Sequence, residues 1–346
     1  MDTQARGVAD ALGLVYEMKR VEPRGLWKHM APWGPVSPSE RLGAAGSLFA
    51  PPWPSVVIAT GRASIPYVRA VRRKAGPATF SVVLQDPKTG PGTADLIWAP
   101  AHDLRRGANV ITTLTSPHSF THERLAALRG ATPPAIAALP SPRVAVVLGG
   151  KNAVYKFTDA DDERLEAALR SLAALGASFL VTPSRRTHPR LIARVDQATR
   201  SSPRILWSGE GDNPYADFLA HSDMLVVTAD SVNMTGEACA TGKPVLVFHP
   251  SRGSDKFSRF HRALEQYGAT RPLSETLDQI PSWEYKPLDS AAEIAAEIER
   301  RWSRRSSMIS GLMSGRAEAA GDGRRRARAG LRQKGSAATS EHREDR

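Results

Sequence analysis

The sequence has almost no cysteine and no long apolar segment, and each absence excludes a class of protein. Cys239 is the only cysteine among 346 residues, which excludes an internal disulfide and a cysteine zinc site. A membrane-spanning helix needs about 18 consecutive apolar residues, and every uninterrupted apolar run in this sequence is shorter. The N-terminus also lacks the basic and apolar regions of a secretory signal peptide. We therefore expect a globular cytoplasmic protein, with about two domains at roughly 150 residues each.

Negative charge is the scarcer sign, with 35 acidic against 47 basic residues and a net charge of +12. Residues 301–346 alone hold 12 basic and 5 acidic residues, so the rest of the chain is only mildly basic. This tail has almost no large apolar residues, and we predict disorder over 306–346. No aromatic residue lies among its arginines at 324–328, so bases would have no stacking platform and we expect no nucleic-acid partner. A solvated tail and peripheral contact with the anionic inner face of a membrane both remain open.

Short and nearly continuous apolar runs recur along the chain. Because they do not alternate with polar residues, both faces of each run should be buried, as in a parallel sheet. Amphipathic helical stretches lie between most of them, and this alternation predicts right-handed βαβ units and an α/β fold. The predicted strands are 55–60, 79–85, 94–99, 108–113, 143–150, 177–184, 204–208, 223–230 and 244–250. The predicted helices include 159–175, 187–200, 213–222, 231–241 and 290–304.

The strands fall into two sets, separated by a proline-rich break at 131–142. We predict two Rossmann-like, doubly wound α/β domains in tandem, residues 1–139 and residues 140–305, with an interdomain cleft. A ligand is expected in that cleft, at the carboxyl ends of the strands. Within the first domain, the stretch 23–54 holds seven prolines and three tryptophans. We predict that it forms a long loop packed by its own aromatic side chains.

Several familiar nucleotide and metal motifs are incomplete. Residues 236–244 resemble a phosphate loop, but five residues separate the glycines and a proline replaces the hydroxyl that would hold magnesium. Residues 209–214 begin like a dinucleotide fingerprint but have proline at the third glycine position. The chain has no Tyr-x-x-x-Lys pair of the reductase and epimerase type. His118 and His122 have the spacing of two zinc ligands on a helix, but a neighbouring proline and the lack of a third ligand lead us to expect no metal and no other cofactor.

The most informative stretch is 227–245, which predicts a buried strand, a tight turn, a helix and the next strand. Free N–H groups at the start of that helix, together with the helix dipole, suit a phosphate. Ser231 could cap the helix and donate to the phosphate, and Glu237, nearly two turns further on, could accept hydrogen bonds from a ribose diol. Lys243 adds a positive charge that we expect to face the diphosphate. A plain capped helix with a solvated Glu237 is the alternative.

Two other strand ends carry candidate binding residues. Gly149 and Gly150 follow one strand, and paired glycines there permit close approach of the backbone to a ligand, although an ordinary strand-to-helix turn would look similar. Ser184, Arg185 and Arg186 lie in the stretch 182–187 at the end of another strand, where two arginines and three hydroxyls could clamp a diphosphate. A solvated helix start is the alternative for those three residues.

The first domain offers a candidate for proton transfer. His102 follows a predicted strand and is the best general base there, with Asp103 next to it to orient the imidazole. A role in capping the chain turn explains the same two residues equally well.

These motifs occur together, in order, in a family that the chain resembles. They are GR at 61–62, QDP at 85–87, PAHD at 100–103, NVITT at 109–113, LGG at 148–150, TPSRRT at 182–187, DNPY at 212–215 and the whole stretch 227–245. Over about residues 3–300 the sequence resembles the mitochondrial-fission "elongated mitochondria" family. Bacterial members are often labelled fission proteins or predicted nucleoside-diphosphate-sugar epimerases, and plant members recruit a dynamin-related protein to the outer mitochondrial membrane.

The stretch 227–245 is also similar to GT-B glycosyltransferases, whose second domain holds the nucleotide-sugar donor. That resemblance implies that Glu237 binds ribose and that Ser231, Gly149 and Gly150 line the diphosphate. Asn213 of the DNPY motif is a further candidate for nucleotide-sugar binding. Family members usually begin with a strand and a glycine-rich loop, whereas Met1 here directly precedes the first helical stretch. Either the start codon is assigned too late, or the first strand of the N-terminal domain is missing.

Two functions follow as hypotheses. The first is a GT-B-like protein that binds a nucleoside-diphosphate sugar as substrate and transfers the glycosyl group to an unknown acceptor. The second is a non-catalytic adaptor that recruits a partner protein at a membrane surface. The first predicts that Glu237 matters for nucleotide binding, and the second predicts that the basic tail governs localisation.

Overall fold

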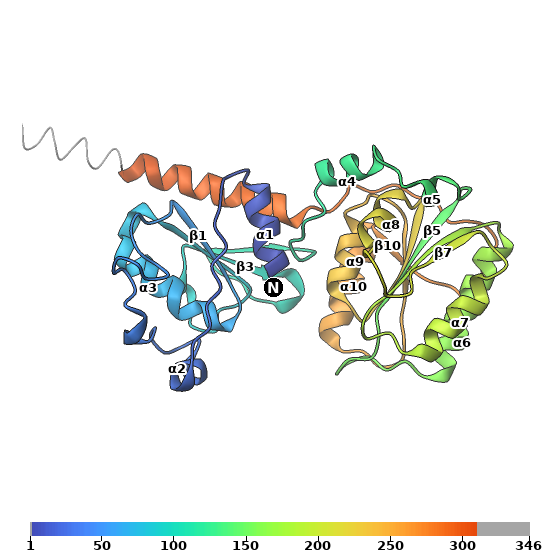
Figure 1. The fold of residues 1–346 in the computed structure, drawn as a ribbon, viewed down its shortest axis with the longest axis horizontal. Coiled ribbons are helices and arrows are strands. Elements are labelled where there is room, and N and C mark those ends of the chain that lie inside the picture. The colour runs from blue at the N-terminus through green and yellow to red at the C-terminus, as the bar shows by residue number, and fades with distance from the viewer. Residues whose placement is uncertain (1, 310–346) are drawn as a thin grey trace, which may run out of the picture. The chain divides into compact units, whose positions relative to one another are not determined.

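Two parallel β-sheets follow one another along the chain in the computed structural model, which describes residues 2–309 (Figure 1). The predicted α/β class is therefore confirmed. The strands are β1 (Val56–Thr60), β2 (Phe80–Leu84), β3 (Leu96–Pro100), β4 (Val110–Thr113), β5 (Arg143–Leu148), β6 (Ser178–Pro183), β7 (Arg204–Leu206), β8 (Met224–Thr228), β9 (Val245–Phe248) and β10 (Thr270–Pro272). All nine predicted strands are present, and β10 is an addition.

From β5 to β10 an α-helix separates each strand from the next, as the βαβ pattern requires, whereas in the first sheet only β1 and β2 are joined by an α-helix. The helices are α1 (Asp2–Ala11), α2 (Gly25–Met30), α3 (Ile65–Ala75), α4 (His122–Arg129), α5 (Pro134–Ala137), α6 (Asp159–Ala174), α7 (Pro189–Thr199), α8 (Tyr215–His221), α9 (Val232–Cys239) and α10 (Asp255–Tyr267), with a last helix over 290–309. Short 3₁₀ turns are η1 (Pro38–Glu40), η2 (Arg62–Ser64), η3 (Gly76–Ala78), η4 (Pro91–Thr93) and η5 (Ala101–Asp103). The five predicted helices are confirmed, whereas α2, α3, α4, α5 and α10 had not been predicted.

The first sheet has the strand order β1-β2-β3-β4, with every neighbouring pair parallel. Ala59, Val83, Ile97 and Val110 lie side by side across the four strands and form one apolar row. This row packs against the buried side of α3. Strand order follows chain order throughout, so this sheet has no point of reversal within the described residues.

The second sheet has the order β10-β9-β8-β5-β6-β7, in which the chain starts at β5, moves outward to β7 and returns to the other side at β8. This is the Rossmann order. Both faces are buried, as the continuous apolar runs predict. One face packs on α6 and α7, and the other on α8, α9 and α10. Helices on both faces make this sheet doubly wound, as expected.

The stretch 120–139 needs a correction. We placed it at the end of the first domain, but Phe120, Leu125, Ile136 and Leu139 are buried in the same core as the second sheet. The side chain of Arg129 reinforces that packing, because it donates hydrogen bonds to the carbonyl oxygens of Ala220 and Thr241 at 3.0 and 3.1 Å. The linker at 131–142 also contains α5 rather than being wholly irregular. The other domain limits stay a prediction.

Residues 297–309 form a structural unit separate from the residues up to Ala296. Within that helical segment, Glu297 pairs with Arg300 and Arg301 at 2.7 and 2.5 Å. Residues 306–309, predicted as the start of a disordered tail, are helical. The remainder of the predicted tail, 310–346, lies outside the described residues. No helix within residues 2–309 is long and apolar enough to cross a membrane.

Candidate functional site

The reversal of strand order between β5 and β8 defines the candidate site. Loops that follow the two central strands of a doubly wound sheet diverge to opposite faces, and ligands bind in the crevice between them. The loop after β5 contains Gly149 and Gly150, and the loop after β8 leads to Ser231. Ser184, which follows β6, lies at the same edge of the sheet. The structure therefore brings these four predicted residues together.

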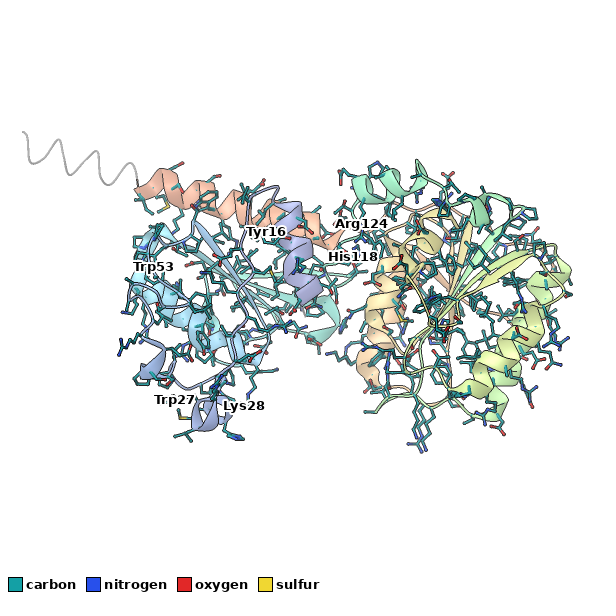
Figure 2. All side chains as sticks on the ribbon, viewed as in Figure 1. Tyr16, Trp27, Lys28, Trp53, His118 and Arg124 are labelled. Atoms are coloured by element: carbon teal, nitrogen blue, oxygen red, sulfur yellow. The ribbon has the colours of Figure 1, made fainter. Side chains whose placement is uncertain are left out.

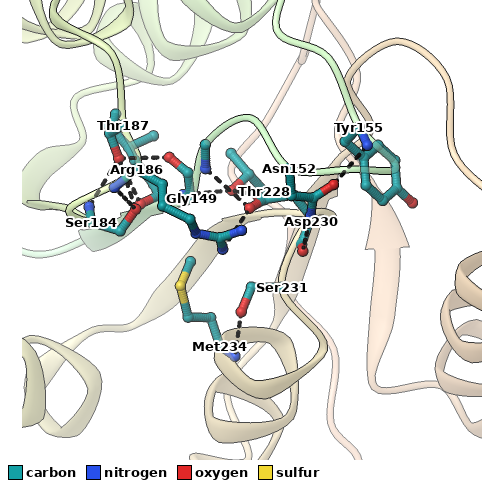
Figure 3. A network of polar contacts seen from close by, with 12 residues as sticks. Gly149, Asn152, Tyr155, Ser184, Arg186, Thr187, Thr228, Asp230, Ser231 and Met234 are labelled. Carbon is teal, nitrogen blue, oxygen red and sulfur yellow. Dashed lines mark hydrogen bonds and ion pairs between the residues drawn. The ribbon is translucent and has the colours of Figure 1, made fainter.

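Asp230 is the centre of the polar contacts at this edge (Figure 3). Its carboxylate is fully buried and accepts hydrogen bonds from the backbone N–H of Gly150 at 3.0 Å and from the Thr228 hydroxyl at 2.7 Å. It also pairs with the Arg186 guanidinium at 3.0 Å. Burial raises the pKa of Asp230, and these three contacts oppose that rise. The sequence predicts only a tight turn at this point, and the position of Asp230 directly after a buried strand was the available signal for its further role.

The two glycines of the β5 loop pack against protein atoms. A Cβ on Gly149 would lie 2.0 Å from an Asp230 carboxylate oxygen, and one on Gly150 would lie 1.9 Å from the Arg186 carbonyl oxygen. The Gly149 N–H donates to Thr228 at 2.7 Å, and the Gly150 N–H is held by Asp230. Both N–H groups are therefore occupied within the protein. The predicted role of these glycines in contacting a diphosphate is not supported by this geometry, because the close approach they permit is to Asp230 and Arg186.

The arginines after β6 are in different situations. Arg186 has 45% of its side chain exposed, so its pairing with Asp230 leaves part of the guanidinium open to solvent. Arg185 is exposed, and its side chain has no ion-pair partner in the part of the chain that the structure describes. Ser184 shapes the turn between them and β6, since its hydroxyl accepts from the Arg186 N–H at 3.2 Å. The cluster can thus present two cationic groups to an anion, while Ser184 has a backbone role.

Ser231 caps α9. Its hydroxyl oxygen accepts a hydrogen bond from the Met234 N–H at 3.4 Å (Figure 3). This hydrogen bond is long, but it joins the residues that an N-cap joins. The cap confirms that α9 begins where the sequence analysis placed it, at the turn after β8. The positive end of the helix dipole therefore lies at the same edge as Arg186.

Glu237, further along α9, is partly buried beside an aromatic cluster that the sequence analysis missed. The hydroxyl of Tyr215 donates to Glu237 Oε2 at 2.6 Å. The Tyr215 ring packs edge-on against Phe120 at 5.8 Å, and the guanidinium of Arg124, labelled in Figure 2, lies 4.8 Å from the centre of the Phe120 ring. Burial raises the pKa of Glu237, while the Tyr215 hydrogen bond and the charge of Arg124 lower it. Tyr215 occurs in the DNPY motif, which was the signal for it.

Two further predicted residues have different outcomes. Asn213 lies between β7 and α8, where its side-chain oxygen accepts from the Tyr215 N–H at 3.0 Å and so begins the helix that holds Tyr215. The prediction for Lys243 is wrong. Lys243 precedes β9 and therefore lies at the amino edge of a parallel sheet, opposite the edge that carries Arg186 and the start of α9. There its carbonyl oxygen accepts from the Tyr285 hydroxyl at 2.8 Å.

The predicted catalytic pair does not form the expected contact. His102 is buried in η5, where its ring packs edge-on against Phe260 at 5.3 Å. Burial, with smaller contributions from Lys256 and Arg259, lowers the pKa of His102 to about 4, although Asp103 opposes the shift. Its Nε2 lies 3.8 Å from Asp103 Oδ1, too far for a hydrogen bond, and Asp103 pairs with Lys256 instead. His102 is therefore a weak base that Asp103 does not orient.

Neither a metal nor a reactive thiol is indicated by the described side chains. Among residues 2–309, no three or more His, Cys, Asp or Glu side chains gather as they would around a metal ion. Cys239 is fully buried, and burial raises the pKa of its thiol. A buried, protonated thiol is a poor nucleophile.

Sequence comparison identifies the relatives of the chain. Residues 1–302 match the family described as Mitochondrial fission ELM1. The chain belongs to this family. The Mitochondrial fission protein ELM1 of Arabidopsis thaliana is 30% identical over 266 residues, which cover 70% of this chain and 62% of that protein. The uncharacterized protein RP120 of Rickettsia prowazekii is 29% identical over 157 residues, 44% of each chain. The chain thus spans less than two thirds of the length of both relatives.

Three solved structures illustrate a partial likeness in fold. The UDP-GlcNAc 2-epimerase of Methanocaldococcus jannaschii has a TM-score of 0.44 at 11% identity, over 72% of this chain and 77% of that one. MurG of Acinetobacter baumannii has a TM-score of 0.40 at 13% identity, over 73% and 65%. The catalytic domain of Starch Synthase IV from Arabidopsis thaliana has a TM-score of 0.35 at 12% identity, over 73% of each chain. At such scores these likenesses carry no argument about ligands, and the fold rests on the strand order of this chain.

Proposed function

We propose that this protein binds a nucleoside-diphosphate sugar at the carboxyl edge of β5 and β8 and transfers the glycosyl group to an acceptor. The observation that carries the proposal is the reversal of strand order at β5 and β8. That reversal brings a partly exposed Arg186 and the start of α9 to one edge, with Glu237 further along the same helix. A cationic side chain and a helix N-terminus are the groups that recognise phosphates.

Each part of the proposed ligand has a group suited to it. The diphosphate pairs with Arg185 and Arg186 and lies over the first N–H groups of α9. The ribose hydroxyls donate to Glu237, whose carboxylate is held on one oxygen by Tyr215 and keeps the other for a ligand. Since Gly149 and Gly150 use their N–H groups within the protein, the arginines supply most of the contacts to the phosphates.

Calorimetric titration of the full chain with UDP, GDP, ADP, CDP and dTDP tests the binding step. We expect one of these nucleotides to bind, and Glu237→Gln and Arg186→Gln each to weaken it by about 10- to 150-fold, since hydrogen bonds to charged groups contribute about 1.5–3 kcal/mol. Lys243→Gln is the matched control, because Lys243 lies at the opposite edge and its loss should leave the affinity unchanged. Binding of no nucleotide, or equal losses in all three variants, would refute the proposed site.

The alternative function is a non-catalytic adaptor that recruits a partner protein at a membrane surface, with the basic tail as the peripheral contact. The observation that favours it is the unfavourable geometry of His102 and Asp103, which leaves the proposed transfer without a good general base. Incubation with a nucleotide sugar separates the two functions. Release of nucleoside diphosphate that depends on Glu237 supports transfer, whereas nucleotide binding without any release supports the adaptor.

A further inference from the structure

The loop 24–34 carries an exposed apolar and basic surface that the nucleotide site does not use. Leu26 is 67% exposed and Trp33 is 63% exposed, so one short loop holds two large apolar side chains that are open to solvent. This contradicts our expectation that the stretch 23–54 packs on its own aromatic side chains. Figure 2 labels Trp27 and Lys28 on α2, which projects beyond α3 at the margin of the first sheet.

The charge of the loop has one sign only. Residues 23–39 contain no Asp or Glu, while Arg24 and Lys28 are exposed cations on either side of Leu26. Arg62, also exposed, places its guanidinium 5.9 Å from the centre of the Trp33 ring. Leu26 and Trp33 are therefore exposed apolar side chains with cations beside them and no acidic residue in the loop. Such a surface complements an anionic lipid bilayer, which is negatively charged at its headgroups and apolar within.

Contacts from α3 and η2 hold the loop in a fixed position. Arg62 donates to the carbonyl oxygens of His29, at 2.8 Å, and Ala31. Arg69 donates to the Trp33 carbonyl oxygen at 3.0 Å, and the Trp33 indole N–H donates to the Lys88 carbonyl oxygen at 3.3 Å. The exposure of Leu26 and Trp33 is therefore built into the fold, because the backbone that carries them is tied down.

The size of the surface favours lipid over protein. Two side chains with about two thirds of their area exposed offer on the order of 300 Å². A stable protein–protein interface buries roughly 800 Å² on each partner. Insertion into a bilayer needs no such area, since a few apolar side chains and nearby cations suffice for reversible binding.

We propose that the loop 24–34 docks on an anionic lipid bilayer, with Leu26 and Trp33 inserted at the headgroup level and Arg24 and Lys28 facing the lipid phosphates. This inference is independent of nucleotide binding. It also differs from the tail contact above, because it assigns the docking surface to residues of the folded chain.

Co-sedimentation of the full chain with vesicles tests the proposal. One set of vesicles is phosphatidylcholine alone, and the other contains roughly 30% phosphatidylglycerol, which gives the surface a negative charge. We expect preferential binding to the anionic vesicles. The double variant Leu26→Ser/Trp33→Ser should lower that binding about tenfold or more, and Arg24→Gln/Lys28→Gln should lower it mainly at low salt. The matched control is Leu14→Ser/Leu48→Ser, which removes two other exposed leucines and should bind as the parent does.

A second variant separates the loop from the tail. Replacing Arg324, Arg325, Arg326 and Arg328 by Gln removes the cluster of positive charge in the tail. We expect that adding Leu26→Ser/Trp33→Ser to this variant lowers its binding to anionic vesicles further. Trp33→Phe should retain binding but reduce quenching of tryptophan fluorescence by brominated lipid. The proposal is overturned if the parent protein does not bind anionic vesicles. That result would indicate that the loop 24–34 contacts a protein partner instead. Binding of the Leu26/Trp33 variant at the parent's level would overturn the proposal as well.

Discussion

Asp230 is the residue on which the arrangement of the second sheet's loops depends. It joins the loop after β5, through the Gly150 N–H, to the loop after β6, through Arg186. A buried carboxylate is costly unless it is paired and hydrogen-bonded, and Asp230 satisfies both conditions. Asp230 therefore leaves room for only the smallest residue at position 149.

Gly149→Ala should destabilise the protein because its Cβ would overlap the Asp230 carboxylate. We expect a loss of about 1–3 kcal/mol in the free energy of unfolding, the range for overpacking a buried site. Gly92→Ala is the control, since a Cβ there meets nothing within 4 Å. It should change stability by less than about 0.5 kcal/mol. Urea unfolding measures both, and equal values for the two variants would contradict the packing described.

Tyr215→Phe removes the hydroxyl that donates to Glu237. The free energy of unfolding should fall by about 1–3 kcal/mol, because a partly buried carboxylate loses its hydrogen bond. The pKa of Glu237, already raised by burial, should rise further. Tyr16→Phe is a matched control, since the Tyr16 hydroxyl donates to Asp10 at 2.7 Å in an exposed position. Urea unfolding of both variants decides the matter, and a larger loss for Tyr16→Phe would count against a special role for Tyr215.

At the scale of elements, α4 is the clearest disagreement between sequence and structure. Its sequence is helical, but nothing in it specifies which sheet it packs on. The structure places Leu125 in the core of the second sheet, and Thr121 caps the helix by accepting from the Arg124 N–H. The proline-rich break at 131–142 therefore does not mark the change from one core to the other.

Leu125→Ala tests that placement. Removing a buried leucine costs about 2–5 kcal/mol, and the loss should appear as faster amide hydrogen exchange in β5 and β8. Strands β2 and β3 should keep their protection at moderate denaturant concentration. Leu48→Ala, at an exposed position, should leave exchange unchanged in both sheets. Faster exchange in β2 and β3 alone would show that α4 belongs to the first sheet.

The strands were predictable because each is a continuous apolar run buried on both faces. The exceptions have physical reasons. Strand β10 has three residues, of which Arg271 and Pro272 are exposed, so it carries no apolar run. Helix α10 has a clear apolar spacing at Phe257, Phe260 and Leu264, and its omission was a missed signal in the sequence.

For the whole molecule, buried histidines should make stability depend on pH. Burial lowers the pKa of both His102 and His261 to about 4, against about 6.5 in an unfolded chain. Between these values the unfolded state binds more protons, so stability falls as pH decreases from about 6.5 towards 4. Each histidine contributes about 3 kcal/mol to that loss. Asp230 and Glu237, whose pKa values are raised, act in the opposite direction.

Urea unfolding at intervals between pH 7 and pH 4.5 measures this dependence. In the structure, His261 Nε2 donates to the Ala229 carbonyl oxygen at 2.9 Å, and the amide of Gln can replace that donor. His261→Gln should therefore flatten the decline in the free energy of unfolding, because one proton-binding group is gone. His29→Gln, at an exposed position, should leave the decline unchanged. Identical pH profiles for the parent and His261→Gln would refute the assignment.

The sequence by itself determined the α/β class, the positions of nine strands and the family, because these depend on local apolar runs and on residue patterns. It also placed Ser231 at a helix start, a property of neighbouring residues. Only the tertiary structure decided which groups meet across the chain. In that structure the N–H groups of Gly149 and Gly150 donate to protein acceptors, and Tyr215 pairs with Glu237. Lys243 lies at the opposite edge of the sheet. Those outcomes depend on strand order and on contacts between distant residues, neither of which is written in any local stretch of sequence.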